Sequence, residues 1–137
     1  MTLPADDPRR QLLGKHGFDA ALPGIELGDV GGNTAELTLP VSEQVVNMVG
    51  TLHGGAIATL VDVAGTIAIM AADQEHRPGV TTDLNVSYFA AGRLGDTVTA
   101  RARTLKSGKT LAFVSVHLSN QDGTLLAHGR MTKFMGR

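Results

Sequence analysis

The longest uninterrupted apolar stretch of this chain constrains its fold more than any other feature. Residues 55–72 read GAIATLVDVAGTIAIMAA, with no proline and with Ala, Ile, Leu, Val and Met in the majority. The stretch predicts a helix over Gly55–Ala72, about 27 Å long. Apolar residues surround it on all sides instead of forming one stripe, which predicts a helix buried in the core.

A membrane-spanning helix is the competing interpretation of this stretch, because about 20 apolar residues suffice to span a bilayer. Asp62 lies in its middle, many of its residues are Ala, Gly or Thr, and no basic residues flank it. We therefore expect no membrane span.

Asp62 has two interpretations. A carboxylate on a helix can cap or hydrogen-bond a neighbouring element, or it can be a general base or nucleophile held in a cleft. Gly54 and Gly55 stand at the start of the helix, where free N–H groups favour an anion or oxyanion. Asp62 lies about 10–12 Å further along the axis, which is too far for both groups of one helix to act on one carbonyl. Two helices related by a two-fold axis would solve this, so we predict a composite site in a homodimer.

Composition restricts the protein class. The 137 residues are 42% hydrophobic and 18% charged, which predicts a single folded domain over residues 1–137. The net charge of −1 and the aromatic content of 4% argue against a nucleic-acid partner. The absence of cysteine excludes disulfides and thiolate metal sites. The N-terminus lacks the pattern of a signal peptide, and we expect a cytoplasmic protein.

The remaining segments predict mainly strands. Residues 1–23 form a polar lead-in in which Asp6-Asp7-Pro8 could start a short helix that runs through Gln11-Leu12-Leu13, and Gly31-Gly32 signals a hairpin. Alternating side chains and turn residues predict strands at 25–30, 33–39, 80–90, 97–106, 110–120 and 124–134. In the third of these, Thr81 is expected on the face opposite Val80 and Leu84. The prediction is an α+β fold in which an antiparallel meander of six strands curls round the helix.

The individual motifs of the chain resemble those of a known family. The resemblance rests on Asn47, on GTLHGG at 50–55, on ATLVD at 58–62, on Gly79, Val80, Asp83, Asn85 and Tyr88, on GKTLAF at 108–113, and on Gly129, Arg130, Thr132 and Lys133. Together they cover about two thirds of the chain. It is similar to the PaaI-like acyl-CoA thioesterases of the hotdog fold, and within them to the mammalian thioesterase-superfamily-member-two type.

The resemblance implies specific roles. Asp62 would be the catalytic carboxylate, as base or nucleophile, and Gly54 would give its N–H to the thioester oxygen of a substrate bound across the dimer. Asn47 would help to position substrate or water, and His53 would orient the loop or polarise the thioester. Thr81 would take the place of a serine that assists the water. A tetramer built as a dimer of dimers is also implied, and no cofactor is needed because coenzyme A is part of the substrate.

Other interpretations stay open at this stage. His53 could satisfy a backbone group, and Asn47 could cap a turn. A hotdog hydratase or dehydratase acting on enoyl thioesters is one rival function, and a non-catalytic acyl-CoA-binding protein is the other. We expect no zinc site among His16, His76, His117 and His128, and no serine triad at Ser115 or Ser119. Solvated positions are expected for Lys106, Lys109, Arg130, Lys133 and Arg137. The acyl group and the basic residues that would hold the phosphates of coenzyme A are left open.

Overall fold

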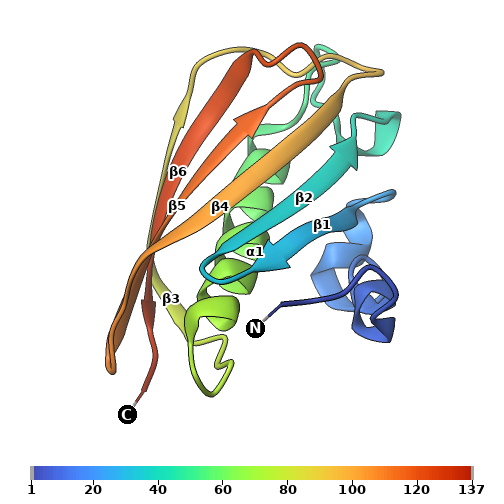
Figure 1. The fold of residues 1–137 in the computed structure, drawn as a ribbon. Coiled ribbons are helices and arrows are strands. Elements are labelled where there is room, and N and C mark those ends of the chain that lie inside the picture. The colour runs from blue at the N-terminus through green and yellow to red at the C-terminus, as the bar shows by residue number, and fades with distance from the viewer. Residues whose placement is uncertain (1, 137) are drawn as a thin grey trace.

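A computed structural model describes residues 2–136, so that Arg137, one of the basic residues expected to be solvated, lies outside it. One long helix, α1 (Gly54–Ala72), packs against a six-stranded antiparallel sheet (Figure 1). The strands are β1 (Glu26–Gly31), β2 (Thr34–Pro40), β3 (Val80–Tyr88), β4 (Thr97–Ser107), β5 (Leu111–Ser119) and β6 (Leu125–Phe134). Three 3-10 helices, η1 (Pro8–Leu12), η2 (Gly17–Ala21) and η3 (Glu43–Val45), complete the described elements. The predicted α+β architecture is confirmed.

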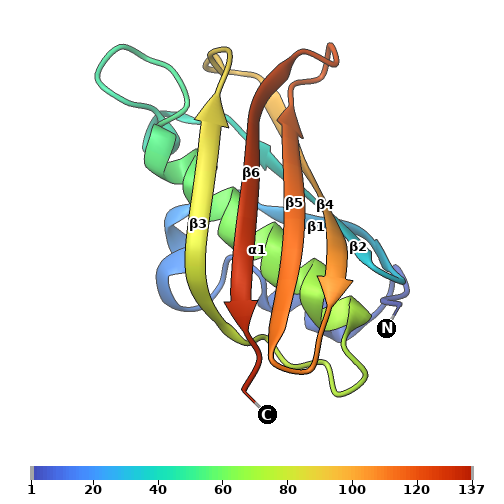
Figure 2. The ribbon, with the colours of Figure 1, turned by 90° about the vertical axis from the view of Figure 1, so that its left-hand side faces the viewer.

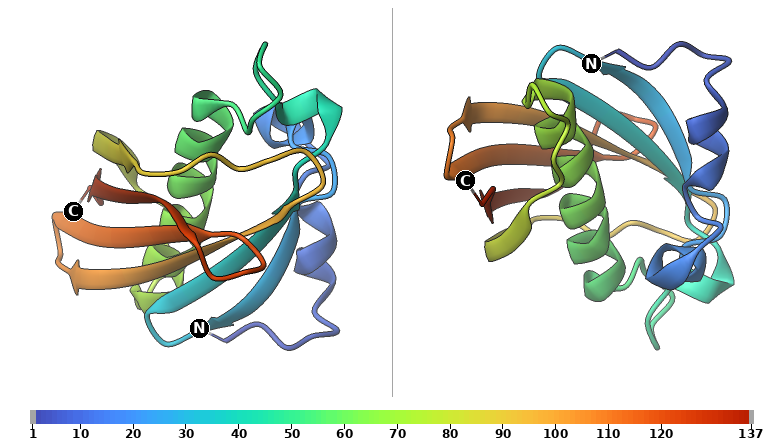
Figure 3. Two further views of the ribbon diagram at one scale, coloured as in Figure 1. Left: turned by 90° about the horizontal axis from the view of Figure 1, so that it is seen from above. Right: turned by 90° about the horizontal axis from the view of Figure 1, so that it is seen from below.

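Helix α1 runs obliquely behind the strands (Figure 2), and the sheet curls round it (Figure 3). Glycines let the two layers approach closely. A Cβ at Gly65 would lie 2.7 Å from Cε of Met131, and one at Gly129 would lie 2.6 Å from Cγ1 of Val61. Real Cβ atoms almost never come so near to another atom. The sheet therefore contacts the helix at places where a side chain is missing.

The predicted burial of α1 on all sides is wrong for the single chain. One face is buried against the sheet and includes Leu60, Val61, Ala64 and Ile69. The other face, with Asp62, Val63, Thr66, Ile67 and Met70, is half-buried and borders a cavity. The helix is long and apolar enough to cross a membrane by length and composition, a test that core helices also pass.

The predicted meander holds for β4, β5 and β6 but is wrong for β3. The order across the sheet is β1-β2-β4-β5-β6-β3, so β3 pairs with β6 and not with β4. Strand β4 already has β2 on one side and β5 on the other, which leaves no free edge for β3. The connection over residues 89–96 therefore carries the chain from β3, at the edge of the sheet, back across it to β4.

An irregularity in β3 decides which way Thr81 points. Thr81 is opposite Lys133 and Leu84 is opposite Met131, with a break in the register between Thr81 and Asp83. A bulge of this kind moves the following residues to the other face of the strand. Thr81 therefore shares the helix-facing side with Leu84, and the predicted alternation, which placed the two on opposite faces, is wrong here.

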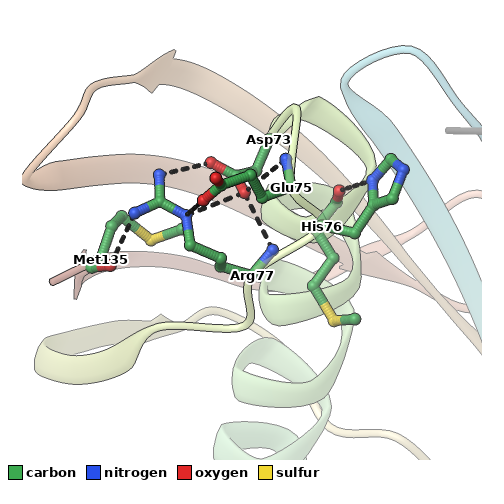
Figure 4. A network of polar contacts seen from close by, with 6 residues as sticks. Asp73, Glu75, His76, Arg77 and Met135 are labelled. Atoms are coloured by element: carbon green, nitrogen blue, oxygen red, sulfur yellow. Dashed lines mark hydrogen bonds and ion pairs between the residues drawn. The ribbon is translucent and has the colours of Figure 1, made fainter. Parts of the chain in front are cut away.

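A polar network ends helix α1 (Figure 4). The Asp73 carboxylate, 6% exposed, accepts bonds from Nε and Nη2 of Arg77 at 3.0 and 2.7 Å, and from the backbone N–H groups of Glu75 and Arg77. Nη1 of Arg77 donates to the carbonyl oxygen of Met135. The hydrogen bonds from Arg77 hold the pKa of Asp73 at about 2, below its ordinary value. The network ties the end of the helix to the end of the sheet.

The polar lead-in is ordered against β1. Asp7 caps η1 by accepting from the backbone N–H of Arg9, and the short helix expected here is a 3-10 helix that begins at Pro8 and ends at Leu12. The guanidinium of Arg10 donates to the carbonyl oxygens of Leu27, Gly28 and Leu3. These bonds hold the N-terminal segment beside α1, where it closes one side of the cavity near Asp62.

Candidate active site

Asp62 and Thr81 are in direct contact. The Thr81 hydroxyl donates to Oδ1 of Asp62 over 2.9 Å and lies 3.6 Å from the sulfur of Met131. Both side chains are half-buried. No described residue donates a hydrogen bond to the second carboxylate oxygen, Oδ2, which leaves it able to accept a proton or to bind water. The structure thus joins two of the five predicted site residues.

A cavity of about 580 Å³ opens beside this pair. Its walls come from the N-terminal segment, β1, α1 and β6, and they are mostly apolar. The apolar wall residues are Leu3, Leu12, Leu13, Leu27, Val63, Ile67 and Met70, and they surround Asp62, Thr66 and Lys133. Its volume is within the range of small-molecule sites. Another hollow of about 570 Å³, between the N-terminal segment and β1, contains none of the predicted site residues.

The start of α1 holds a second group of predicted residues. Nδ1 of His53 accepts a hydrogen bond from the backbone N–H of Gly55 at 2.8 Å, so His53 caps the helix. A neutral imidazole that accepts at Nδ1 carries its proton on Nε2 and can donate from there. The N–H of Gly54 has no acceptor among residues 2–136. The hydroxyl of Tyr88 donates to the carbonyl oxygen of Gly54 at 3.0 Å and fixes this turn against β3.

Asn47 orders the loop that precedes the helix. Its Oδ1 accepts from the backbone N–H groups of Val49 and Thr51, and its Nδ2 donates to the hydroxyl of Thr51 at 2.8 Å. Within a single chain, Asn47 therefore acts as a turn cap, one of the two interpretations that the sequence left open. The loop ends in two apolar side chains, Met48 and Val49, which are 104% and 82% exposed.

The five residues thus form two separate groups within one chain. Asp62 and Thr81 lie at the middle of α1, whereas Asn47, His53 and Gly54 lie at its start. Asp62 is eight positions after Gly54, which corresponds to about 12 Å along the helix axis. The prediction of a shared site rests on this separation, because both groups of one chain cannot reach the same carbonyl.

Lys133 is a residue that the sequence interpretation placed wrongly. It was expected to be solvated, yet it is 5% exposed and borders the same cavity as Asp62. The signal was present in the sequence. Ala127, Gly129 and Met131 alternate with polar residues along β6, and the same period places Lys133 on their side, toward the helix.

Two histidines expected to be scattered are in fact neighbours. The rings of His117 and His128 stack at 4.4 Å between their centroids on the outer face of the sheet, and Nε2 of His128 lies 2.7 Å from the Ser115 hydroxyl. Burial lowers the pKa of His128, and the nearby charges of His117 and Arg130 lower it further. No carboxylate bonds to His128 within the described chain, so Ser115 and His128 lack the third member of a catalytic triad. Residues 2–136 also contain no cluster of side chains suited to a metal ion.

The comparisons with known proteins agree with this architecture. Residues 49–127 match the family model described as Thioesterase superfamily. The mouse protein acyl-coenzyme A thioesterase 13 is 42% identical over 121 residues, which are 88% of this chain and 86% of the mouse protein.

Solved structures give the same result. Zebrafish thioesterase superfamily member 2 superposes with a TM-score of 0.87 at 41% identity, over 93% of this chain and 92% of the zebrafish chain. A hypothetical thioesterase of Streptococcus pneumoniae, solved with coenzyme A, has a TM-score of 0.80 at 25% identity, over 85% and 89% of the two chains. The resemblance found in the sequence and the hotdog fold that it implied are confirmed.

Proposed function

This chain belongs to the thioesterase superfamily, and we propose that it hydrolyses an acyl-CoA or aryl-CoA thioester to the free acid and coenzyme A. One observation carries the proposal. The Asp62 carboxylate is held at the wall of an apolar cavity by the Thr81 hydroxyl, and its other oxygen has no donor among residues 2–136. The name of the mouse relative and the coenzyme A in the Streptococcus structure support the substrate class.

The carboxylate can act in two ways. As a general base, Oδ2 of Asp62 takes a proton from water while the water oxygen attacks the thioester carbon, and the thiolate of coenzyme A leaves when the carbonyl re-forms. As a nucleophile, Asp62 attacks the carbon itself and the thiolate of coenzyme A leaves, and water then hydrolyses the mixed anhydride to the free acid and the Asp62 carboxylate. Thr81 has the same task in both cases, because its hydrogen bond fixes the orientation of the carboxylate.

The thioester oxygen needs donors that one chain does not bring to Asp62. We place this oxygen at the Gly54 N–H of a second copy, with the Nε2–H of the copy's His53 beside it. The lack of an acceptor for the Gly54 N–H supports this placement. The side chain of Asn47 is already hydrogen-bonded to the backbone of its own loop. Asn47 would therefore position the substrate indirectly, by fixing the conformation of this loop.

Two features support a second copy at this place. Met48 and Val49 at the tip of the Asn47 loop are almost fully exposed, which suits a surface covered by a partner. Strand β3, which carries Thr81, is an edge strand and can pair with β3 of a two-fold related copy. The homotetramer and the cytoplasmic location remain proposals that rest on the resemblance and on the sequence.

The rival function as an enoyl-thioester hydratase or dehydratase has less support. Such an enzyme needs a histidine that takes a proton from, or returns it to, the substrate or water. His53 accepts at Nδ1 and so carries its proton on Nε2, which makes it a donor to a carbonyl and not a base. A non-catalytic acyl-CoA-binding protein would not need Asp62 and Thr81 in contact at the cavity wall.

The activity is tested by the release of free thiol from a panel of aryl-acetyl, hydroxybenzoyl, medium-chain and long-chain acyl-CoA substrates. We expect hydrolysis by the wild type and a loss of orders of magnitude in kcat for Asp62→Asn, with unchanged folding. With a 2-enoyl-CoA as a further substrate, loss of enoyl absorbance without thiol release would identify a hydratase. Near-normal hydrolysis by Asp62→Asn would remove Asp62 from the mechanism.

The shared site is tested by mixing two inactive variants. Asp62→Ala removes the carboxylate, and Gly54→Pro removes the N–H donor at the first helical position, where proline is tolerated. Refolded together, they form some dimers with one intact site, so part of the activity should return. Refolding of each variant with itself is the control. Mixed dimers confirmed by mass spectrometry but inactive would contradict the shared site.

A further inference from the structure

Lys133 lies on the side of the sheet that faces the helix, and packing alone does not explain a lysine there. Lys133 is 5% exposed and forms no hydrogen bond or ion pair with its side chain among residues 2–136. Its β-sheet partners are Thr81 on β3 and Ala112 on β5, and all three face the helix. Ala112 is fully buried, and Thr81 is bonded to Asp62.

A buried lysine without a partner is costly. Lysine is rarely buried unless it is paired, and removing an ammonium from water without compensation costs several kcal/mol in real proteins. A methionine of similar length would fill the same space at lower cost. A purely structural role therefore gives a poor account of the ammonium at this position.

The cavity gives the ammonium a counterpart in Asp62. Both residues line the same space, and Lys133 is the strand neighbour of the threonine that holds Asp62. Burial lowers the pKa of Lys133, and the negative charge of Asp62 opposes this shift. The two charges attract each other, although no direct ion pair joins them among the described residues.

The other charged groups around the cavity do not replace Lys133. Arg9 of η1 is ion-paired with Asp7 at 2.7 Å, and Nδ1 of His76 is bonded to the carbonyl oxygen of Met70. Asp19 of η2 adds a second negative charge to the cavity lining. Lys133 is thus the buried cation next to the Asp62–Thr81 pair.

We propose that the Lys133 ammonium is the countercharge that favours the ionised form of Asp62, which is the form able to take a proton from water or to attack the thioester. Lys133 is then a positioning residue that acts through Asp62 and does not touch the reacting atoms. The inference rests on the proposed function for its kinetic consequence, but the charge coupling itself is independent of any activity.

The coupling is tested directly by carbon-13 NMR titration of the Asp62 carboxyl group. In Lys133→Met the positive charge is gone, the ionised carboxylate is less favoured, and the midpoint of the titration should move to higher pH. Lys133→Arg keeps the charge and should stay close to the wild type. In the reciprocal experiment Asp62→Asn should lower the pKa of Lys133 further. The exposed Lys106→Met removes one charge elsewhere and should change neither titration.

The same variants give a kinetic test in thiol-release assays. The acid limb of kcat/KM should shift to higher pH in Lys133→Met and return in Lys133→Arg, and an unfolding midpoint at pH 7 no lower than that of the wild type shows that folding is intact. An unmoved Asp62 titration in a folded Lys133→Met would overturn the inference, whatever the activity. A rise in KM alone, with the acid limb unchanged, would also overturn it and would assign Lys133 to substrate binding. A wild type inactive on every acyl-CoA, with the NMR coupling present, would contradict the proposed function and not the coupling.

Discussion

The Thr81 hydroxyl, on the edge strand β3, donates a 2.9 Å hydrogen bond to Oδ1 of Asp62 at the middle of helix α1. This bond crosses from the sheet to the helix and depends on the register break that follows Thr81 in β3. Without the bulge Thr81 would face away from the helix. The orientation of the carboxylate is therefore set by an irregularity in a strand that lies next to the proposed partner.

Two replacements of Thr81 distinguish the role of its hydroxyl from that of its methyl group. Thr81→Val keeps the shape but loses the donor, so Asp62 is no longer held, and kcat should fall by about 10-fold to 100-fold, as expected for loss of one hydrogen bond to a charged group. Thr81→Ser keeps the hydroxyl and should retain most of the activity. Thiol release at saturating acyl-CoA measures both. Equal activity of the Val and Ser variants would mean that the bond has no role in turnover.

Gly54 offers an equally sharp pair of variants. His53 has φ −61° and ψ 135°, a conformation that the residue before a proline readily adopts, so Gly54→Pro should fold while lacking the N–H. Loss of one oxyanion donor typically costs about 10²–10³ in kcat. Gly54→Ala is the control, because its Cβ would lie 3.6 Å from the Tyr88 ring, an ordinary contact, and its N–H is kept. If the alanine variant lost as much activity as the proline variant, the steric change and not the N–H would be responsible.

The features of this protein that could be predicted from the sequence depend on local sequence patterns, whereas those that could not depend mostly on contacts between distant segments. The helix and the six strands were predictable within one or two residues, because apolar periodicity is local, and His53-Gly54-Gly55 marked the helix start. The place of β3 beside β6 was not, since strand order depends on which edges other strands already occupy. The inward turn of Thr81 depends on a bulge without a glycine or proline to signal it. Lys133 was predictable from the alternation along β6, but the general preference of lysine for solvent outweighed that local signal.

The contact between Gly129 of β6 and Val61 of α1 should control the position of the neighbouring Asp62. A Cβ at Gly129 would lie 2.6 and 2.7 Å from the two methyl carbons of Val61, so in Gly129→Ala the strand, the Val61 side chain or the helix has to shift. We expect a loss of about 1–3 kcal/mol in the free energy of unfolding, as for other overpacked cores, together with reduced kcat. Urea unfolding and thiol release measure the two effects.

A double mutant tests whether this clash is the cause. Val61→Ala alone creates a cavity and should destabilise the protein. In the combination with Gly129→Ala, the new methyl group occupies space that the valine has vacated, so the double variant should be more stable than the sum of the two single effects predicts. Strict additivity would show that Gly129→Ala acts elsewhere, for example through the strand backbone.

The network at the end of α1 should make stability depend on pH. The pKa of Asp73 is held at about 2 by Arg77, against about 3.9 for an unfolded chain, so the folded protein favours the ionised carboxylate. A group with a lowered folded pKa stabilises the protein above its unfolded pKa, and this contribution disappears as the pH falls from about 4 toward 2. Since Asp73 is 6% exposed and Arg77 is one quarter exposed, solvent screening is limited, and we expect about 2 kcal/mol at pH 7.

Asp73→Asn isolates this contribution. It should lower the free energy of unfolding by about 2 kcal/mol at pH 7, and the difference from the wild type should shrink between pH 4 and pH 2, because the wild-type carboxylate then becomes protonated as well. Asp7, whose pKa is also held at about 2 by Arg9, is present in both proteins and cancels in the comparison. Urea unfolding across this pH range measures the difference, and Asp122→Asn, at an exposed turn residue, is the control. A difference that stayed constant down to pH 2 would mean that Asp73 stabilises the helix end through packing and hydrogen-bond geometry alone, without the charge that Arg77 holds in place.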